Sequence, residues 1–240
     1  LTREIDLIEE IARLIGYDNF ESYLPDPLKP GLLNSRQSIQ KNLSILMCAS
    51  GFQEVTTMSL VPKGIESDLR VPISNPLMKE TSHLRTNLWE EHIDICVRNM
   101  KNGRQGIWIF EIGNIFNLQD ENIIETRSII SGVICGENRL EKWSRPKKDA
   151  SLNYYEARGI IKVIFDSLKL EVHDKRLDKD DILHPGRAAS LILEGKILGK
   201  FGQLHPEITQ SRELPILTYL FELDLESILN ASTRPSKFTP

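Results

Sequence analysis

The sequence lacks the features that mark secreted and membrane proteins. Among its 240 residues are only three cysteines, Cys48, Cys96 and Cys135, which lie far apart and show no metal-binding or redox spacing. We therefore expect buried, reduced thiols and no disulfide framework. No run reaches the roughly 18 apolar residues that a membrane-spanning helix needs, and no signal peptide is visible. These absences predict a protein of a reducing compartment with no membrane partner.

The sequence also has little that would attract nucleic acid or phosphate. Its net charge of −4 gives no global attraction for nucleic acid. The short basic runs Lys147-Lys148 and Lys101 to Arg104 are interpreted as solvated loops. No phosphate-binding glycine loop, nucleophile elbow or convincing metal cluster is found. With 40% hydrophobic and 27% charged residues, the composition is that of an ordinary globular protein.

The most informative stretch, 74–116, predicts an extended loop, a helix, a turn and a strand. Asn87 followed by Glu90 has the spacing of a helix-capping box. Gly103 predicts the end of the helix, because glycine adopts the left-handed conformation at little cost. Alternation over 107–116 then predicts a strand whose more apolar face carries the aromatic side chains.

Hydrophobic periodicity and turn residues predict the other elements. Helices are expected over 2–15, 36–50 and 154–168, and strands over 51–61 and 127–135, with 219–229 as a strand running into a helix. Loops are expected over 117–126 and 137–150. A hairpin with its turn at Glu194-Gly195 is expected between 184 and 206, where Gly199 and Gly202 indicate close packing of a bent strand.

The runs SNP, LRTNL and FEIGNIF occur in this order within 74–116, and HPGR and GQLHP follow within 184–206. In order and spacing they resemble the catalytic-like region of the bacterial-type phenylalanyl-tRNA synthetase β subunits, over about 6–229. The resemblance implies an α+β fold with a class II synthetase-like antiparallel sheet flanked by helices. It also implies an order of segments: the last helix of a preceding domain (1–23), a proline-rich linker (24–34), the catalytic-like domain (35–230) and a tail (231–240).

The resemblance further implies that this domain is not catalytic. In class II synthetases, one strand carries an arginine that grips the ATP α-phosphate, and the matching strand here offers Glu111. A second, motif 3-like stretch contains Glu222, Asp224 and Glu226 and lacks the expected arginine. Carboxylates repel a triphosphate, whereas adenylate formation needs cations. We therefore expect no catalytic or cofactor-binding residue, an inactive chain when alone, and ATP use only in the full α–β complex.

Two arginines and two histidines remain as alternatives for chemistry. Arg85 in HLRTNL and Arg187 in HPGR are expected to make internal or interface hydrogen bonds rather than to contact a substrate. His184 and His205 each precede a proline. They are interpreted as loop histidines that hydrogen-bond the backbone, with a metal ligand or general base as the alternative.

Three carboxylates form the candidate metal site. Asp6, Glu9 and Glu10 lie at i, i+3 and i+4 of the predicted first helix, so all three share one side. Oxygen ligands of this type suit Mg²⁺, although an acidic stripe near a helix N-terminus is also stabilised by the helix dipole. The resemblance implies a Mg²⁺ site shared with the α subunit. A further ligand is expected upstream of Leu1, so the site is incomplete and binding weak or absent.

The function implied by the resemblance is a structural module that docks and supports the catalytic α subunit in an (αβ)2 enzyme that charges tRNA(Phe) with phenylalanine using ATP. Two alternatives stay open: an active class II ligase with relocated cations, and a tRNA-contacting module. The compartment expected from the resemblance is the cytoplasm or the plastid stroma. Apolar surface left without its neighbours would allow the chain to form a homodimer.

Overall fold

The computed structural model describes residues 3–24, 26, 30–64, 70–120, 123–137 and 152–231, which divide between Asn34 and Ser35 into two units. The first unit holds helix α1 (Glu4–Ile15) and a 3-10 turn (Tyr17–Asn19). Gly16, with φ +89°, ends the helix as predicted. None of the residues of α1 is buried, and Ile5, Ile8 and Ile11 are each more than half exposed.

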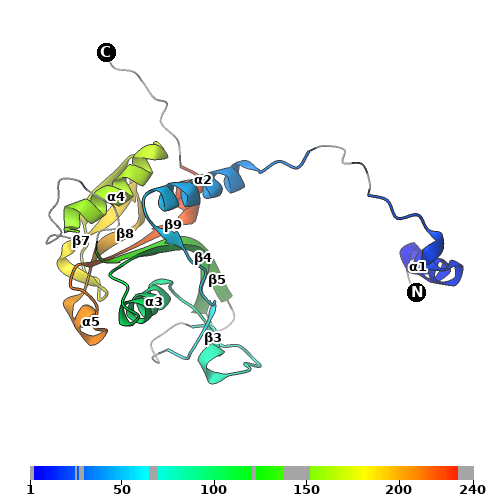
Figure 1. Cartoon of the computed structure of the whole chain (residues 1–240), viewed down its shortest axis with the longest axis horizontal. Coiled ribbons are helices and arrows are strands. Elements are labelled where there is room, and N and C mark those ends of the chain that lie inside the picture. Colours follow the sequence, from blue (N-terminus) through cyan, green and yellow to red (C-terminus); the bar gives the residue numbers. More distant parts are fainter. Residues whose placement is uncertain are drawn as a thin grey trace, which may run out of the picture. The chain divides into compact units, whose positions relative to one another are not determined.

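The second unit is built on a seven-stranded sheet (Figure 1). Its order is β1 (Gln53–Glu54), β4 (Gly106–Asp120), β5 (Ile123–Gly136), β9 (Thr218–Asp224), β8 (Lys196–Leu204), β7 (Leu183–Leu193) and β6 (Val172–Arg176). All neighbouring pairs are antiparallel except β1–β4. Strands β2 (Leu60–Val61) and β3 (His83–Leu84) form a separate two-stranded sheet. A 3-10 turn (Lys79–Thr81), which precedes β3 in the sequence, lies against β2.

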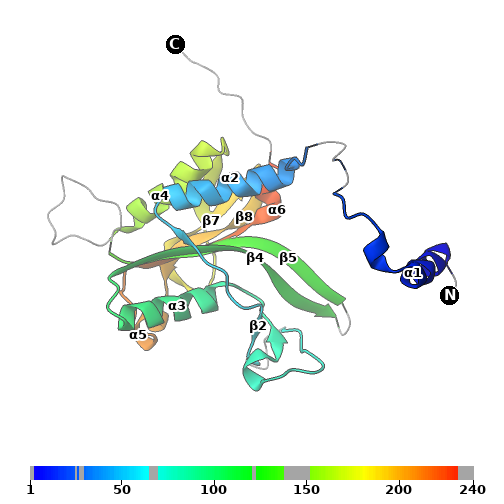
Figure 2. The same cartoon turned by 45° about the vertical axis from the view of Figure 1, so that its right-hand side comes forward.

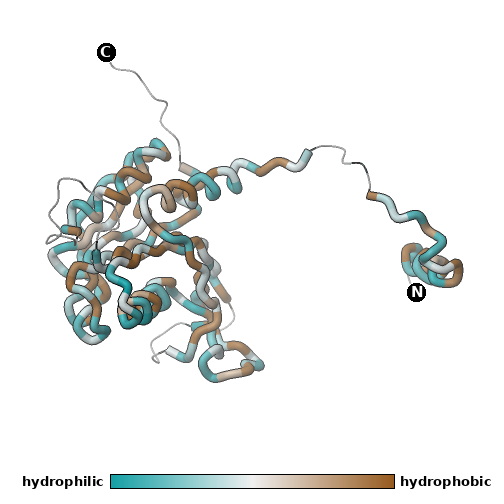
Figure 3. Tube along the Cα trace, viewed as in Figure 1, coloured by the Kyte–Doolittle hydropathy of each residue, from teal (hydrophilic) through white to brown (hydrophobic). Residues whose placement is uncertain are grey.

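Helices cover both faces of the large sheet (Figure 2). Helices α2 (Ser35–Ala49), α4 (Tyr154–Ser167) and α6 (Leu225–Leu229) pack on one face, and α3 (Trp89–Lys101) and α5 (Pro206–Ser211) on the other. Strand β4 supplies both cores, as its alternation predicts. Trp108 and Phe110 are fully buried against α2 and α4, whereas Ile107 and Ile109 are buried against α3. Figure 3 shows apolar residues gathered along these central strands.

Two sequence predictions of secondary structure are wrong. The expected strand over 51–61 is split into β1 and β2, which belong to different sheets, because Thr57 leaves the sheet to hydrogen-bond Glu111. The expected loop over 117–126 is largely strand. Backbone pairing of Phe116 with Thr126 and of Leu118 with Ile124 continues the β4–β5 hairpin into this stretch, whose polar residues predict a loop. The loop expected over 137–150 and the tail fall almost wholly outside the described residues.

The predicted hairpin with its turn at Glu194-Gly195 is confirmed, and it is formed by β7 and β8. Glu194 and Gly195 turn with φ of +51° and +78°, the left-handed pair that a two-residue hairpin of this kind requires. Gly199 touches the next strand so closely that an added Cβ would lie 2.0 Å from the Glu222 carbonyl oxygen. An added Cβ at Gly202 would lie 2.7 Å from the Cβ of Ala188. Both glycines therefore permit the close packing that the sequence indicates.

Candidate functional site: a polar row across the sheet

A row of polar residues crosses one face of the sheet. Neighbouring strands pair Glu111 with Ser131, Ser131 with Glu222, Glu222 with Lys200, and Lys200 with Ser190. Directly opposed residues point to the same face, so these five residues form one line, called here the polar row. The face is that of α3, because Ile109, Val133 and Leu220, two positions away along their strands, pack in the α3 core. The row therefore interrupts an otherwise apolar surface.

Glu111, at the β4 end of the row, is bound from several sides. It is 2% exposed. Its Oε1 accepts a hydrogen bond from Arg85 Nη1 at 2.9 Å, and its Oε2 accepts from the Thr57 hydroxyl at 2.6 Å and from the Thr57 amide at 3.1 Å. Arg85, 5% exposed, also donates Nε–H to the Asn114 carbonyl at 2.9 Å. The predicted internal hydrogen bonds of Arg85 are thereby confirmed.

His92 completes this end of the row. Its ring is fully buried on α3, with Nε2 3.5 Å from Glu111 Oε2. Neither ring nitrogen has a hydrogen-bond partner among the described residues. Burial by itself would raise the pKa of Glu111, but the His92 ring, the Thr57 hydroxyl and the Arg85 guanidinium outweigh it and lower that pKa. Glu111 therefore stays ionised and paired.

The β8 end of the row is also neutralised internally. Lys200 Nζ donates to Asp180 Oδ2 at 2.8 Å. The other oxygen of Asp180 accepts from the backbone amides of Ile182 and Leu183 at 2.8 and 2.9 Å. Burial tends to raise the pKa of Asp180, yet these hydrogen bonds and the Lys200 charge lower it overall. Lys200 is thus committed to a carboxylate.

Ser131 and Glu222, at the centre of the row, lack such hydrogen-bond partners in the part of the chain that the structure describes. Ser131 Oγ and Glu222 Oε2 are buried and have no hydrogen-bond partner among the described residues. Burial raises the pKa of Glu222, against the opposing charges of Lys200 and Arg127. Arg127 itself lies 3.6 Å from Asp224 Oδ2. Both basic residues near Glu222 are therefore closer to another carboxylate.

This charge arrangement limits the chemistry of the face. Stabilising a triphosphate or an adenylate requires cations that are free to meet phosphate oxygens. Lys200, a member of the polar row, is paired with Asp180. Arg85, which is not a member, is paired with Glu111 of the row. Arg187 of the HPGR run donates to Gln203 Oε1 at 3.0 Å, an internal bond as predicted. The row presents carboxylates where phosphate chemistry would need positive charge.

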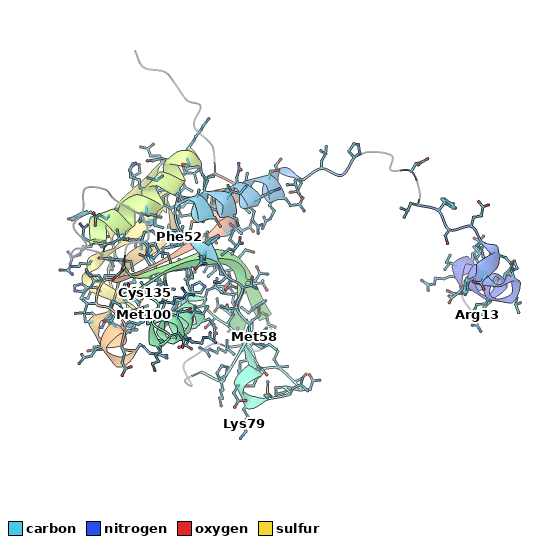
Figure 4. All side chains as sticks on the ribbon, viewed as in Figure 1. Arg13, Phe52, Met58, Lys79, Met100 and Cys135 are labelled. Carbon is cyan, nitrogen blue, oxygen red and sulfur yellow. The ribbon has the colours of Figure 1, made fainter. Side chains whose placement is uncertain are left out.

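The predicted metal ligands lie elsewhere, on α1, where Figure 4 labels Arg13. Asp6 accepts from the Arg3 amide at 3.3 Å, and Glu10 accepts from Arg13 Nη1 at 3.2 Å. In the described part of the chain, no group of three or more His, Cys, Asp or Glu residues is placed to hold a metal ion. The assignment of Asp6, Glu9 and Glu10 to Mg²⁺ stays a prediction.

His184 and His205 both hydrogen-bond the backbone, but His184 lies inside strand β7, whereas His205 lies outside a strand and caps α5. Nδ1 of His184 accepts the Gly186 amide at 3.0 Å, and Nδ1 of His205 accepts the Glu207 amide at 3.3 Å. The predicted backbone hydrogen bonds are confirmed, and the predicted loop placement is wrong for His184. No helix in the described residues has the length and hydropathy needed to cross a bilayer.

Comparison with known proteins gives consistent matches. Residues 21–225 match the family described as the phenylalanyl tRNA synthetase beta chain CLM domain. The phenylalanine–tRNA ligase beta subunits of Synechococcus sp. strains CC9902 and CC9605 are 55% and 52% identical over 240 residues, which is 100% of this chain and 30% of each relative. That of Prochlorococcus marinus strain MIT 9313 is 50% identical and covered to 29%. The chain thus spans about 30% of the length of these curated relatives.

Solved structures support the fold. The pyrrolysyl-tRNA synthetase from Desulfitobacterium hafniense superposes with a TM-score of 0.58 at 13% sequence identity, covering 81% of this chain and 68% of that one. A second structure of this enzyme, PylSc, gives 0.56 at 13% identity, covering 80% and 64%. At this identity the likeness concerns fold alone. It confirms the predicted α+β, class II synthetase-like antiparallel sheet.

Proposed function

Since the chain belongs to the phenylalanyl-tRNA synthetase β chain family, we propose that it is a non-catalytic structural module of a phenylalanine–tRNA ligase. Its role is to dock and support the catalytic α subunit in an (αβ)2 enzyme that charges tRNA(Phe) with phenylalanine using ATP. The ligase works in the cytoplasm or the plastid stroma, and tRNA(Phe) and ATP meet it only in the complete complex.

The observation that carries the non-catalytic part is the neutralised polar row. Arg85 and Lys200 are each bound to a buried or half-buried carboxylate, at 2.9 and 2.8 Å. Freeing either cation for a phosphate would leave Glu111 or Asp180 without its partner, which is expensive in a poorly solvated site. A sheet face whose cations are paired internally suits a structural role and not the formation of an adenylate.

Helix α2 is our candidate for the docking surface. Helix α2 followed by strand β1 resembles motif 1 of class II synthetases, which is a long helix followed by a strand and lies at dimer interfaces in that class. Leu43 and Met47 are buried against the sheet, whereas Ile45 on the opposite side is 54% exposed. An apolar side chain presented by a helix that is already packed on its own core suits a protein contact.

Docking is tested by size-exclusion chromatography with light scattering, on the chain alone and mixed with the phenylalanine–tRNA ligase α subunit of Synechococcus sp. CC9902. Circular dichroism first establishes that the chain is folded. We expect a stable complex that Ile45→Asp weakens. Ile197→Asp, at a 72% exposed position of β8, serves as the matched control and leaves the complex intact. A well-folded chain that forms no complex would contradict the docking role.

Catalysis is tested separately by ATP–pyrophosphate exchange with phenylalanine. We expect no exchange by the chain alone, and exchange above background would favour the active-ligase alternative. The tRNA-contacting alternative predicts filter binding of tRNA(Phe) with a steep dependence on salt. For Asp6, Glu9 and Glu10, calorimetric titration should show weak or no Mg²⁺ binding. Micromolar, stoichiometric binding would show that the site is complete without a further ligand.

A further inference from the structure

A recess of about 580 Å³ lies at the β1 edge of the large sheet, between helix α3 and the first residues of β4. Its floor is apolar. Ile107 and Ile109 of β4, 5% and 3% exposed, form it together with Ile95 of α3 and Val55 next to β1. The other lining residues are polar or glycine. An apolar floor beside polar groups is the usual composition of a site that receives a ligand or a segment of another protein.

The sheet edge beside this recess has backbone groups without a partner. Strand β1 pairs only with Ile109 and Phe110, whereas β4 begins earlier, at Gly106. The Val55 amide donates to the Phe110 carbonyl at 2.9 Å, so Phe110 directs its backbone groups to this edge. Alternate residues of a strand face the same edge, and Gly106 therefore does so as well. Its amide and carbonyl have no hydrogen-bond partner among the described residues. An unpaired edge is a template for another extended segment.

The recess also contains one unpaired positive charge. Its two charged lining residues are Arg104 and Glu54. Glu54 is the register partner of Phe110, whose side chain lies in the core under α2, and its Oε1 accepts from the Ser44 hydroxyl of α2 at 3.2 Å. The side chain of Arg104 makes no hydrogen bond or ion pair with any described residue. A segment that enters the recess therefore meets a guanidinium whose N–H donors suit a carboxylate.

We propose that the recess receives an extended segment of the α subunit that carries an Asp or Glu side chain opposite Arg104. The backbone of this segment pairs with the open edge at Gly106, and an apolar side chain covers the isoleucine floor. A phosphate fits less well, because it leaves the floor and the edge uncovered. The α subunit is the partner because α2, which presents Ile45 for docking, contacts β1 and leads directly into it. This inference rests on the proposed docking role and adds the chemistry that recognises the partner.

The first test measures the affinity of the chain for the phenylalanine–tRNA ligase α subunit of Synechococcus sp. CC9902 by isothermal titration calorimetry. Arg104→Gln removes the charge from the recess, and we expect it to weaken the complex about tenfold, through the loss of one charge-assisted hydrogen bond. Arg98→Gln removes the same charge from an exposed position of α3 that does not line the recess, and it should leave the affinity nearly unchanged. Equal affinities of the two variants would overturn the recess and leave the docking role intact, whereas the absence of any complex would overturn both.

The second test locates the bound segment by photo-crosslinking. Gln105→p-benzoylphenylalanine places the crosslinker at an exposed residue that lines the recess. Mass spectrometry of the irradiated complex should identify a crosslinked α-subunit peptide that contains Asp or Glu. Lys175→p-benzoylphenylalanine is the matched control, because Lys175 is exposed on β6 at the opposite edge of the sheet, and it should give no such product. A complex that forms without this crosslink from position 105, or with a peptide that has no acidic residue, would refute the proposal.

Discussion

At the scale of single residues, Arg85 and Glu111 show how a buried charge pair is kept in place. Both are nearly inaccessible, and each has hydrogen-bonding groups beyond the other: the Asn114 carbonyl for Arg85, and the Thr57 hydroxyl and amide for Glu111. A buried pair of this kind contributes little net stability when it is complete. Removing one partner is costly, because the remaining charge stays buried.

We therefore predict that Arg85→Ala destabilises the chain by about 3–5 kcal/mol. Denaturant unfolding followed by tryptophan fluorescence measures this loss. The deficit should shrink in acid, as Glu111 of the variant becomes protonated and its buried charge disappears. In the wild type the pKa of Glu111 is lowered, so the ionised Glu111 contributes to folding stability at pH values above the ordinary carboxyl pKa. This stabilisation is lost as pH falls through the lowered pKa of the folded state.

Arg212→Ala is the matched control for this prediction. Arg212 pairs with Asp94 at 2.9 Å, but both side chains are about half exposed, so solvent screens the pair. Its loss should change stability by less than about 1 kcal/mol. Equal effects of the two substitutions would show that the Arg85 pair is not buried as described.

Unlike Arg85→Ala, the substitution Glu222→Gln should increase the free energy of unfolding at neutral pH. Burial raises the pKa of Glu222, so the folded state binds a proton more readily than the unfolded state and the ionised form is penalised by folding. The variant avoids this penalty at pH 7. As pH falls through the raised pKa toward the unfolded value near 4.3, the wild type becomes protonated and the advantage should vanish. Thermal unfolding from pH 7 to pH 4 measures it, and a constant difference would contradict this account.

Some interactions between residues can be predicted from the sequence and others cannot. The spacing of Asn87 and Glu90 predicts their mutual hydrogen bonds, which form at 3.1 Å although the helix itself begins at Trp89. Glu111 draws attention as an acid where an arginine is expected. Ser131 and Lys200 carry no such signal. They join the polar row only through strand register, which depends on pairings between distant segments.

At the scale of elements, local patterns predict best where side chains and backbone agree. The β7–β8 turn has the residues its geometry needs, and helix α4 buries the face that its periodicity indicates. The outer part of the β4–β5 hairpin is different, because its polar composition reads as a loop. Its strand conformation comes from cross-strand backbone pairing, a tertiary effect that overrides local preference.

The Gly199 contact gives a test at this scale. An added Cβ would lie 2.0 Å from the Glu222 carbonyl oxygen, so Gly199→Ala must push β8 away from β9. We expect a loss of about 1–3 kcal/mol or more in denaturant unfolding. Gly159→Ala is the matched control. It lies within α4 with no atom inside 4 Å of an added Cβ, so it should gain up to about 1 kcal/mol from helix propensity.

At the scale of the whole second unit, strand β4 ties two helical layers into one structure. Trp108 lies in the core under α2 and α4, while Trp89 packs against the core of α3. Because β4 supplies residues to both cores, neither layer can lose its packing while the other keeps it. The unit is therefore expected to unfold as one cooperative body.

Incorporation of 5-fluorotryptophan tests this without substitution, since ¹⁹F NMR reports each tryptophan separately. We expect the native signals of Trp89 and Trp108 to disappear at the same denaturant concentration. Earlier loss of Trp89 would show that the α3 layer melts by itself. Such a result would also change the meaning of the Arg85 experiment, because Arg85 contacts the α3 side of the sheet.

The position of β9 has a consequence for synthesis of the chain. Strands β4 and β5 pair early in the sequence and β7 and β8 pair later, but only β9, residues 218–224, joins the two hairpins. On the ribosome the sheet must wait as two halves with open edges until β9 emerges, almost at the end of the described chain. A translational pause or a truncation before residue 218 would leave those edges unpaired, and unpaired edges are where strands from different molecules associate.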